Sequence, residues 1–362
     1  MNQIDNLDGK ATQFWHRINE DKIQCDLCPR FCQLQQGQRG LCFVRANHLG
    51  KIVSTSYGRS SGFCIDPIEK KPLNHFLPGT PVLSFGTAGC NLSCKYCQNW
   101  DMSKSRQQDT LADQASPEKI AQTALKYQCR SVAFTYNDPV IFHEYAIDVA
   151  QACHHYDIKS VAVSAAYVCE KPMQQFYQQM DAANIDLKAF SDEFYRKICG
   201  GHLQPVLDTL KYIKHKTNVW LEITTLLIPN KNDSDEELNA MTQWIAKELG
   251  TDVPLHFSAF HPDYKMNDVL PTSHLSLKRA KQIALKNGLR YVYLGNVHDK
   301  PNQSTYCHEC GDLLIGRDWY ELSEWHLDSN GDCKTCGTAC VGQFEEAVGK
   351  WGAKRLPISL GI

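Results

Sequence analysis

The chain has 362 residues, more than one average domain but compatible with a single α/β barrel that carries appendages. Its hydrophobic content of 43% supplies a sizeable core, and 38 basic against 40 acidic residues leave a net charge of -2. No global field therefore draws it to nucleic acid or anionic lipid. The start is polar and acidic, and no segment has the roughly 18 uninterrupted apolar residues of a membrane span. We expect a cytoplasmic protein without nucleic-acid or membrane partners.

Cysteines are abundant, with 17 in the chain. The cytosol keeps thiols reduced, so clustered cysteines there indicate metal sites rather than disulfides. The first set in chain order is Cys25, Cys28, Cys32 and Cys42, in QCDLCPRFCQLQQGQRGLC. Its spacing differs from the ferredoxin run, and it could hold zinc or a second cluster, or three members could be loop residues. We predict a metal or cluster here without choosing which.

A regular alternation of short apolar runs and helical segments begins at Pro81. We expect strands at 82–85, 131–135, 160–164, 185–187, 219–227, 255–260 and 291–294. One helix should begin at Ser116, and another should run from capping acids in DSDEELNAMTQWIAKELG to Gly250. The fold class is therefore α/β: a partial or full (β/α) TIM-like barrel over 81–300, a Cys-rich extension over 1–80 and a C-terminal module over 301–362.

A second cysteine set, Cys90, Cys94 and Cys97, lies on the loop directly after the first barrel strand. Three thiolates leave one iron of a four-iron cluster without a protein ligand. That open position could receive a small chelating ligand, as the open position of a catalytic zinc site does. A structural zinc loop is the alternative, but it needs a fourth ligand, and no His or Cys follows within the next few residues.

Charged and polar residues recur near other barrel strands. The turn TYNDP at 135–139 follows the second strand, and Asn-Asp-Pro is also ordinary turn chemistry. Asp186 and Lys188 alternate on one strand and face the same way, which is costly in a barrel unless they are paired or functional. In DPIEKKP, Glu69, Lys70 and Lys71 either form a solvated turn or cover the barrel mouth and touch substrate.

The third cysteine set is Cys307, Cys310, Cys333 and Cys336. Two CxxCG turns complete a closed tetrahedral site, which predicts a zinc-ribbon or rubredoxin-like module holding zinc, or iron that could shuttle electrons. Cys64, Cys129, Cys153, Cys169 and Cys340 stand alone. For Cys129, Cys153 and Cys169, in or beside apolar stretches, we predict small buried hydrophobes.

The motif CxxxCxxC at Cys90, Cys94 and Cys97 resembles that of the radical S-adenosylmethionine (SAM) superfamily, and Tyr96 matches the aromatic residue before its third cysteine. The resemblance implies a [4Fe-4S] cluster whose open iron binds the amino and carboxylate groups of SAM. One electron then cleaves the sulfonium, which releases methionine and a 5′-deoxyadenosyl radical that abstracts hydrogen from a substrate.

The same resemblance extends to further positions. Asn137 and Asp138 stand where the superfamily has a turn that meets the methionine amino group. Asp186, Lys188 and His261 match positions near SAM in the glycyl-radical-enzyme activases. After the third strand the activases have Asp-Thr-Asn-Gly, but this chain has Val-Ser-Ala-Ala, so only Ser164 could keep a hydrogen bond to the cofactor.

Longer segments, including DPIEKKPLNHFLPG, DAANIDLKAFSDEFYRKICGG and FHPDYKM, resemble the AmmeMemoRadiSam-system radical enzymes, relatives of the pyruvate formate-lyase activating enzyme. This implies Memo-like and AMMECR-type partners and an electron donor such as flavodoxin or ferredoxin, with the substrate unassigned. The alternatives are an activase that installs a glycyl radical on a partner enzyme and, in a different class, an iron-sulfur electron carrier or metal-scaffolded interaction protein.

Overall fold

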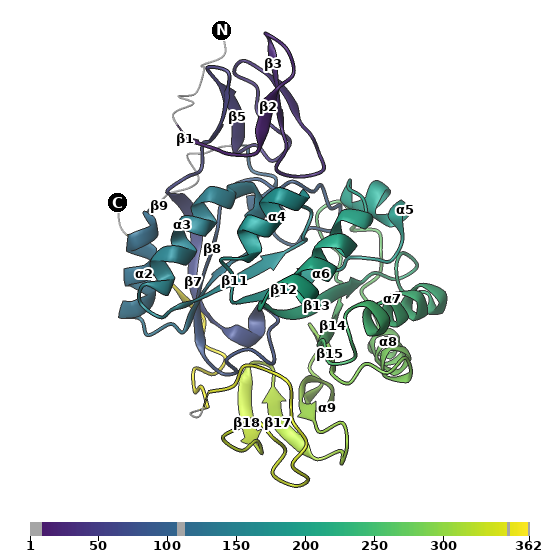
Figure 1. Cartoon of the computed structure of the whole chain (residues 1–362). Coiled ribbons are helices and arrows are strands. Elements are labelled where there is room, and N and C mark those ends of the chain that lie inside the picture. The colour runs from purple at the N-terminus through teal and green to yellow at the C-terminus, as the bar shows by residue number, and fades with distance from the viewer. Residues whose placement is uncertain (1–8, 107–112, 346–347, 361–362) are drawn as a thin grey trace.

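The computed structural model describes residues 9–106, 113–345 and 348–360 (Figure 1). Its centre is a sheet in which seven strands run parallel. These are β8 (Pro81–Gly86), β10 (Ser131–Phe134), β11 (Lys159–Ser164), β12 (Ala182–Asp186), β13 (Trp220–Leu227), β14 (Leu255–Ala259) and β15 (Val292–Gly295). Each overlaps a strand expected from the sequence, so the predicted alternation is confirmed. The prediction that Asp186 and Lys188 share one strand is wrong, because β12 begins at Ala182 and ends at Asp186, and Lys188 lies in the loop after it.

The sheet is open in the described part of the chain. Its order runs β15-β14-β13-β12-β11-β10-β8-β7-β19, so β15 and β19 (Leu356–Pro357) form the two edges. The long strand β7 (Arg59–Pro67) pairs antiparallel with β8, and β9 (Asp113–Gln114) pairs with β7. The described residues thus form an open sheet with parallel strands, and a full, closed barrel is absent from them. Strand β7 belongs to this sheet, although it lies in the segment 1–80.

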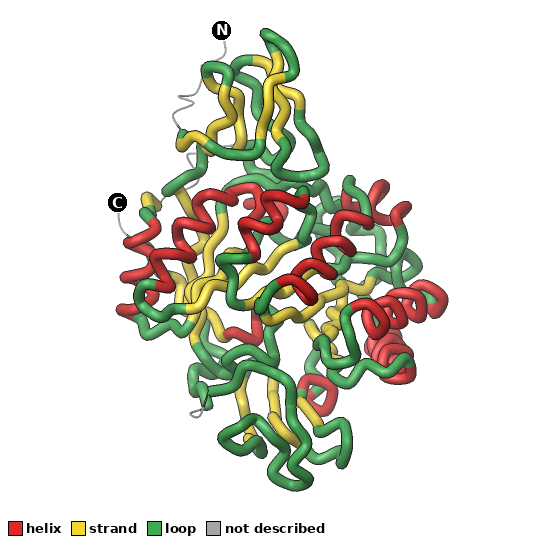
Figure 2. Tube along the Cα trace, viewed as in Figure 1, coloured by secondary structure: helices red, strands yellow, loops and turns green. Residues whose placement is uncertain are grey.

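Helices form an outer layer against the sheet (Figure 2). The longer ones are α2 (Pro117–Lys126), α3 (His143–His154), α4 (Glu170–Tyr177), α6 (Gln204–Lys216), α7 (Asp235–Glu248) and α8 (His274–Lys286). Three short helices lie in connecting segments: α1 (Trp100–Ser103), α5 (Asp192–Phe194) and α9 (Lys300–Gln303). Ser116 caps α2, as predicted. The predicted acidic cap of α7 is wrong: Ser234 accepts from Glu237 N, and the acids occupy the first turn. No helix among the described residues is long and apolar enough to cross a membrane.

Two small structures lie at opposite ends of the view in Figure 1. One consists of two three-stranded sheets, formed by β1 (Lys10–Ala11), β5 (Arg45–His48) and β6 (Lys51–Ser54), and by β2 (Trp15–Arg17), β3 (Lys22–Cys25) and β4 (Gln33–Gln35). The other is the sheet of β16 (Thr305–Tyr306), β17 (Leu313–Asp318) and β18 (Glu321–Trp325). The first carries the N-terminal cysteine set, and the second carries the C-terminal set.

The segment after β7 packs into the protein rather than into solvent. It begins with the short turn η1 (Ile68–Lys70), and its apolar side chains pack against residues of β8 and β10. Glu69 and Lys71 are only 5% and 3% exposed, and Lys71 Nζ lies 2.7 Å from an Asp66 carboxylate oxygen. A solvated turn is therefore excluded for these two residues. The segment is instead part of the packed interior of the protein.

Candidate active site

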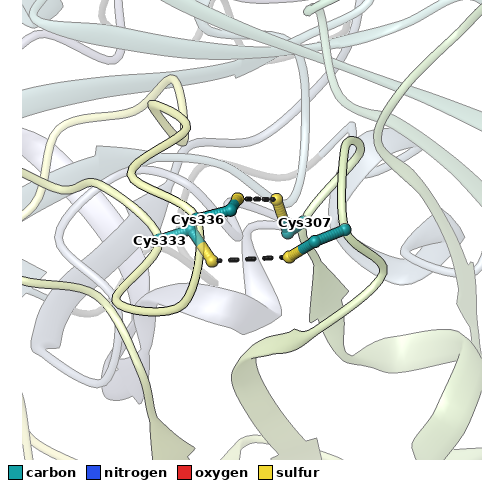
Figure 3. A group of neighbouring side chains, drawn as sticks. Cys307, Cys333 and Cys336 are labelled. Carbon is teal, nitrogen blue, oxygen red and sulfur yellow. Dashed lines mark hydrogen bonds between the residues drawn. The ribbon is translucent and has the colours of Figure 1, made fainter.

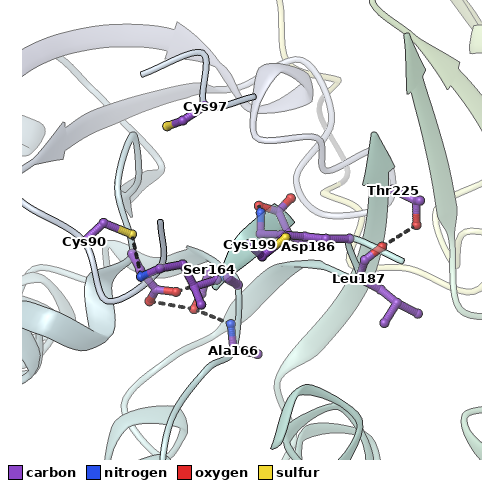
Figure 4. Close-up of polar contacts among 12 residues, drawn as sticks. Cys90, Cys97, Ser164, Ala166, Asp186, Leu187, Cys199 and Thr225 are labelled. Carbon is purple, nitrogen blue, oxygen red and sulfur yellow. Dashed lines mark hydrogen bonds and ion pairs between the residues drawn. The ribbon is translucent and has the colours of Figure 1, made fainter. Parts of the chain in front are cut away.

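The loop after β8 brings the three cysteines of the predicted cluster site together. Cys90, Cys94 and Cys97 line one cavity of about 310 Å³. Cys90 and Cys97 lie on the loop in Figure 4, and the Cys97 and Ser103 side chains approach to 3.1 Å. Three thiols facing one cavity are the donor set that a [4Fe-4S] cluster with one open iron requires, so the residues fit that group.

Asn137 shapes this cysteine loop from the neighbouring strand. Its amide nitrogen donates to the carbonyls of Thr87 and Gly89 at 2.8 and 2.7 Å, and its Oδ1 accepts from Thr87 N at 3.2 Å. Each polar atom of the buried Asn137 amide is thus used by the backbone just before Cys90. This residue, predicted to touch the cofactor, lines the cavity and also fixes the loop that carries the cysteines.

Asp138 faces the same cavity and is held in place by β11. Its carboxylate accepts from Ser164 Oγ and from Ala165 N, both at 3.0 Å. Burial raises the pKa of Asp138, although these donors and Val140 N oppose the shift. Ser164 is buried beneath Asp138, and its hydroxyl also accepts from Ala166 N (Figure 4). Its observed hydrogen bonds orient Asp138.

Asp186 and Lys188 form the predicted charged pair. Lys188 Nζ lies 2.9 Å from Asp186 Oδ2, and both residues line the cavity. Burial alone would lower the pKa of Lys188, but the neighbouring Asp186, Cys94 and Cys199 outweigh it and hold that pKa well above its usual value. Lys188 is therefore a permanent cation facing the site, where it favours anionic ligands such as a carboxylate.

Cys199 is a buried thiol beside this site that the sequence analysis did not single out. It ends the π-helical turn η3 (Tyr195–Cys199), and its sulfur lies 3.6 Å from the hydroxyl of Tyr96. Burial opposes its ionisation, but hydrogen bonds with Cys94 and Tyr96 and the charge of Lys188 lower its pKa. The available signal was its place in YRKICGG, directly before two glycines, which no periodicity rule marks as functional.

His261 lies at the rim rather than inside the cavity. It is exposed, and its Nε2 lies 2.9 Å from Nε2 of Gln98, a residue of the cysteine loop that does line the cavity. Tyr96, by contrast, is buried and lines the cavity. The structure thus brings the predicted cofactor-binding residues to one region. Ser164 and His261 do not line the cavity themselves, but each contacts a residue that does: Ser164 contacts Asp138 and His261 contacts Gln98.

A second cavity, of about 90 Å³, adjoins the first. The two share Pro72, Ser258 and Asn296, and the second is walled by Glu69 and, from the C-terminal module, Arg317. Further walls come from Lys70, Asn74, His256, Tyr293, Gln303, Trp319 and Tyr320. Sequence reasoning did not predict this cavity, because its walls come from two distant segments, 69–74 and 256–320.

This second cavity contains buried charge with unused hydrogen-bonding capacity. Glu69 Oε1 accepts from Gly79 N at 2.7 Å, but Oε2 has no partner among the described residues. Burial raises the pKa of Glu69 to about 7, against the opposing charge of Arg317. Arg317 Nη2 donates to Asn74 O at 2.6 Å, and its Nε is also without a partner in the described chain. Such groups are suited to a polar ligand.

The C-terminal cysteines form a compact set (Figure 3). The sulfur atoms of Cys307, Cys310, Cys333 and Cys336 all lie within 4.8 Å of one another, with Cys307 and Cys336 at 3.6 Å and Cys310 and Cys333 at 3.8 Å. Four sulfurs at about 2.3 Å around one tetrahedral ion stand about 3.8 Å apart. The set is therefore shaped for a single metal ion.

The lone cysteines have mixed environments. Cys129 and Cys153 are buried, as predicted. Cys169 is only partly buried, so the prediction of a buried hydrophobe is wrong for it. Its backbone N–H donates to Leu27 O at 3.0 Å, which places it beside the N-terminal cysteine segment.

Comparison with known proteins agrees with this geometry. Residues 85–241 match the model of the radical SAM superfamily. An uncharacterized protein of Methanocaldococcus jannaschii is 38% identical over 91% of this chain and 98% of its own length. The 4-hydroxyphenylacetate decarboxylase activating enzyme of Clostridioides difficile is 20% identical over 70% of this chain and 84% of its own. The pyruvate formate-lyase 1-activating enzyme of Escherichia coli K12 is 20% identical over 60% and 93%, respectively.

The chain belongs to the radical SAM superfamily, whose members are enzymes. Two of its named relatives are activating enzymes. Membership implies a [4Fe-4S] cluster and SAM as cofactors, and the cysteine loop with its cavity is the place in this chain that fits them.

Proposed function

We propose that this protein is a radical SAM enzyme of the AmmeMemoRadiSam type that abstracts hydrogen from a substrate held next to the cysteine loop. The observation that carries this is the convergence of Cys90, Cys94 and Cys97 on one cavity with a partly buried cation, Lys188. When bound, the cluster supplies one electron for reductive cleavage of SAM to methionine and a 5′-deoxyadenosyl radical.

The chain's own residues would bind and orient this cofactor. Lys188 offers a charge to the carboxylate of SAM, while Asp138 and Asp186 offer acceptors to its ammonium group. Tyr96 and Asn137 wall the site, Ser164 holds Asp138, and His261 orders the rim through Gln98. The buried cavity walls keep water away from a reactive radical.

The second cavity is our proposed substrate subsite. It opens from the first through Ser258 and Asn296, so a ligand there would lie beside the cofactor. The uncompensated Glu69 oxygen suits a hydrogen-bond donor on the substrate, and Trp319 supplies an apolar wall. A polar substrate with an amide or amine group meets these requirements.

The first experiment is anaerobic assay of reconstituted, dithionite-reduced enzyme for 5′-deoxyadenosine. We predict that Cys94→Ala loses at least about 100-fold of this product, because three thiolates are needed to hold the cluster. Cys129→Ala, a buried cysteine outside the three sets, is the matched control and should keep wild-type formation. Persisting product in Cys94→Ala would contradict the proposal.

Activation of a glycyl-radical enzyme is the second candidate, favoured by the two activating enzymes among the relatives. It requires a macromolecular glycine as the hydrogen donor. Incubation with a co-purified partner should then give a glycyl-radical signal in electron paramagnetic resonance (EPR). Product formation without any protein radical, using a small polar substrate, would favour the first form of the proposal.

We also propose the following assignments for the rest of the molecule. The C-terminal set holds zinc in a ribbon-like module, which is supported by its compact sulfur geometry. The reductant is of the flavodoxin or ferredoxin class, and Memo-like and AMMECR-type proteins are the partners to test by co-purification. Reduced thiols at three metal sites favour the cytoplasm.

A further inference from the structure

We propose that Cys25, Cys28, Cys32 and Cys42 bind a second [4Fe-4S] cluster, placed to pass electrons to the site at Cys90. The second half of this proposal rests on the radical SAM function above, and the first half stands by itself. The four cysteines lie outside the stretch 85–241 that matches the superfamily model.

The four cysteines converge although they span 18 positions of the chain. All four line one cavity, together with Arg30, Gly40, Arg45 and Asn91. Cys25, Cys28 and Cys42 are each at most 9% exposed. A side chain at Gly40 would contact the sulfurs of both Cys32 and Cys42 at 3.7 Å, so these two thiols flank the same small residue. Three buried thiols and the partly buried Cys32 thus converge as a ligand set.

The spacing of the sulfurs distinguishes a cluster from a single ion. The C-terminal set is compact enough for one tetrahedral ion, and no other group of three candidate ligands between residues 9 and 360, apart from 107–112 and 346–347, lies within 4.8 Å. In any three of the N-terminal sulfurs, and among the sulfurs of Cys90, Cys94 and Cys97, at least one pair therefore lies more than 4.8 Å apart. Thiolates on the separate irons of a cluster are farther apart than ligands of one zinc ion.

Unused N–H groups at the cavity point to the same kind of ligand. Arg30 Nη2 and Arg45 Nε are buried without a hydrogen-bond partner in the described residues. Arg45 is 1% exposed, and its Nη2 lies 2.5 Å from Glu144 Oε2, which fixes the guanidinium beside the cysteines. Sulfide and thiolate sulfurs of a cluster accept such N–H groups, and the buried cation stabilises the cluster's negative charge.

The set is in direct contact with the loop of the first cluster site. Gly89, which precedes Cys90, packs so closely on Cys42 that a Cβ there would lie 1.9 Å from the Cys42 carbonyl oxygen. Arg30 Nε donates to Asn91 O at 2.8 Å, directly after Cys90. One electron from a flavodoxin- or ferredoxin-class donor would reduce the N-terminal cluster, which is reoxidised by passing it to the cluster at Cys90. No bond or proton is involved.

The test is iron, sulfide and zinc analysis with EPR on the reconstituted full chain. Wild type should hold about eight iron and about eight sulfide per chain, besides the C-terminal ion. The triple variant Cys90→Ala, Cys94→Ala, Cys97→Ala should keep about half of both, and its reduced EPR signal should not shift with SAM. The double variant Cys28→Ala, Cys32→Ala should lose the iron and sulfide that the triple variant keeps. Cys169→Ala, which lies beside the set but outside it, should lose no iron or sulfide.

A triple variant that folds, as judged by circular dichroism, but holds zinc without sulfide at the N-terminal set would overturn the proposal. This result does not depend on the double variant, whose substitutions could prevent folding. The relay predicts at least tenfold slower 5′-deoxyadenosine formation with flavodoxin in the double variant, and an unchanged rate would refute it. If the triple variant holds a cluster while wild type never cleaves SAM, the proposed function and the relay that rests on it fail, and the N-terminal cluster stands.

Discussion

At the scale of single residues, the interior holds ionisable groups whose pKa is shifted in opposite directions by burial and by their hydrogen-bonding or charged partners. Glu222 Oε2 lies 2.6 Å from His256 Nε2, and this pairing lowers the pKa of Glu222 although burial opposes the shift. Glu69 has a backbone donor and the more distant charge of Arg317, and burial raises its pKa to about 7. The difference matters because a group that stays protonated in the folded protein makes stability depend on pH.

We predict that Glu69→Gln removes such a dependence. A pKa near 7 in the folded state, against 4.5 in the unfolded state, means that stability is fully present below about pH 4.5 and is lost as pH rises through about 7. The loss is at most about 3 kcal/mol. In denaturant unfolding, the free energy of unfolding of the glutamine variant should therefore rise relative to that of wild type between pH 5 and pH 8.

The exposed Glu236→Gln is the matched control, because its carboxylate faces solvent in the first turn of α7. Its difference from wild type should stay constant over the same pH range. An equally constant difference for Glu69→Gln would show that this carboxyl group is not perturbed by burial.

At the scale of elements, the loop after β8 depends on close packing that only glycine permits. Gly89 has φ of +86° and abuts Cys42 O. We predict that Gly89→Ala lowers the free energy of unfolding by about 1–3 kcal/mol more than Gly58→Ala does. Gly58 has a similar φ of +72° but open space around its Cβ position, so it isolates backbone strain from the clash.

Denaturant unfolding of both variants gives the comparison. Equal losses would mean that the cysteine loop can move away from Cys42 at no cost, which would also weaken the argument for a fixed path between the two cysteine sets.

The sequence predicted the elements far better than their contacts. All seven parallel strands follow from apolar runs, because a strand buried on both faces needs such a run regardless of its neighbours. The cysteine loop followed from spacing alone. Three contacts of the site depend instead on strand order. They are the hydrogen bonds from Asn137 to Thr87 and Gly89, the hydrogen bond from Ser164 to Asp138, and the contact between Cys199 and Tyr96. No local pattern encodes these contacts.

At the scale of the whole molecule, the C-terminal module packs on the edge of the sheet. Tyr293 of β15 contacts Thr305 Oγ1 at 2.8 Å and His75 Nε2 at 2.6 Å. The His75 ring in turn lies near Phe344. Burial lowers the pKa of His75 to about 4, so its imidazole is neutral at physiological pH. The module is thus tied to both β15 and the segment after β7.

We predict that Cys310→Ser releases the C-terminal metal, because a closed tetrahedral site needs all four thiolates. Loss of the ion should lower stability by more than about 2 kcal/mol, since metal binding is coupled to folding of such small modules. Zinc analysis and thermal unfolding measure both effects.

Cys340→Ala is the control, because Cys340 packs in the same small core without belonging to the four-sulfur group. It should keep the full metal content. Unchanged metal content in Cys310→Ser would show that the other three cysteines and a solvent ligand suffice.

The position of Arg317 and Trp319 in the chain has a consequence for biosynthesis. Both wall the second cavity, yet both follow all seven parallel strands in sequence. A nascent chain emerging from the ribosome contains all seven parallel strands and the cysteine loop before these two residues, and the edge strand β19, are available. The cavity gains its last wall only when the module has been translated and docked. A ligand in this cavity can therefore be enclosed only by the fully translated chain.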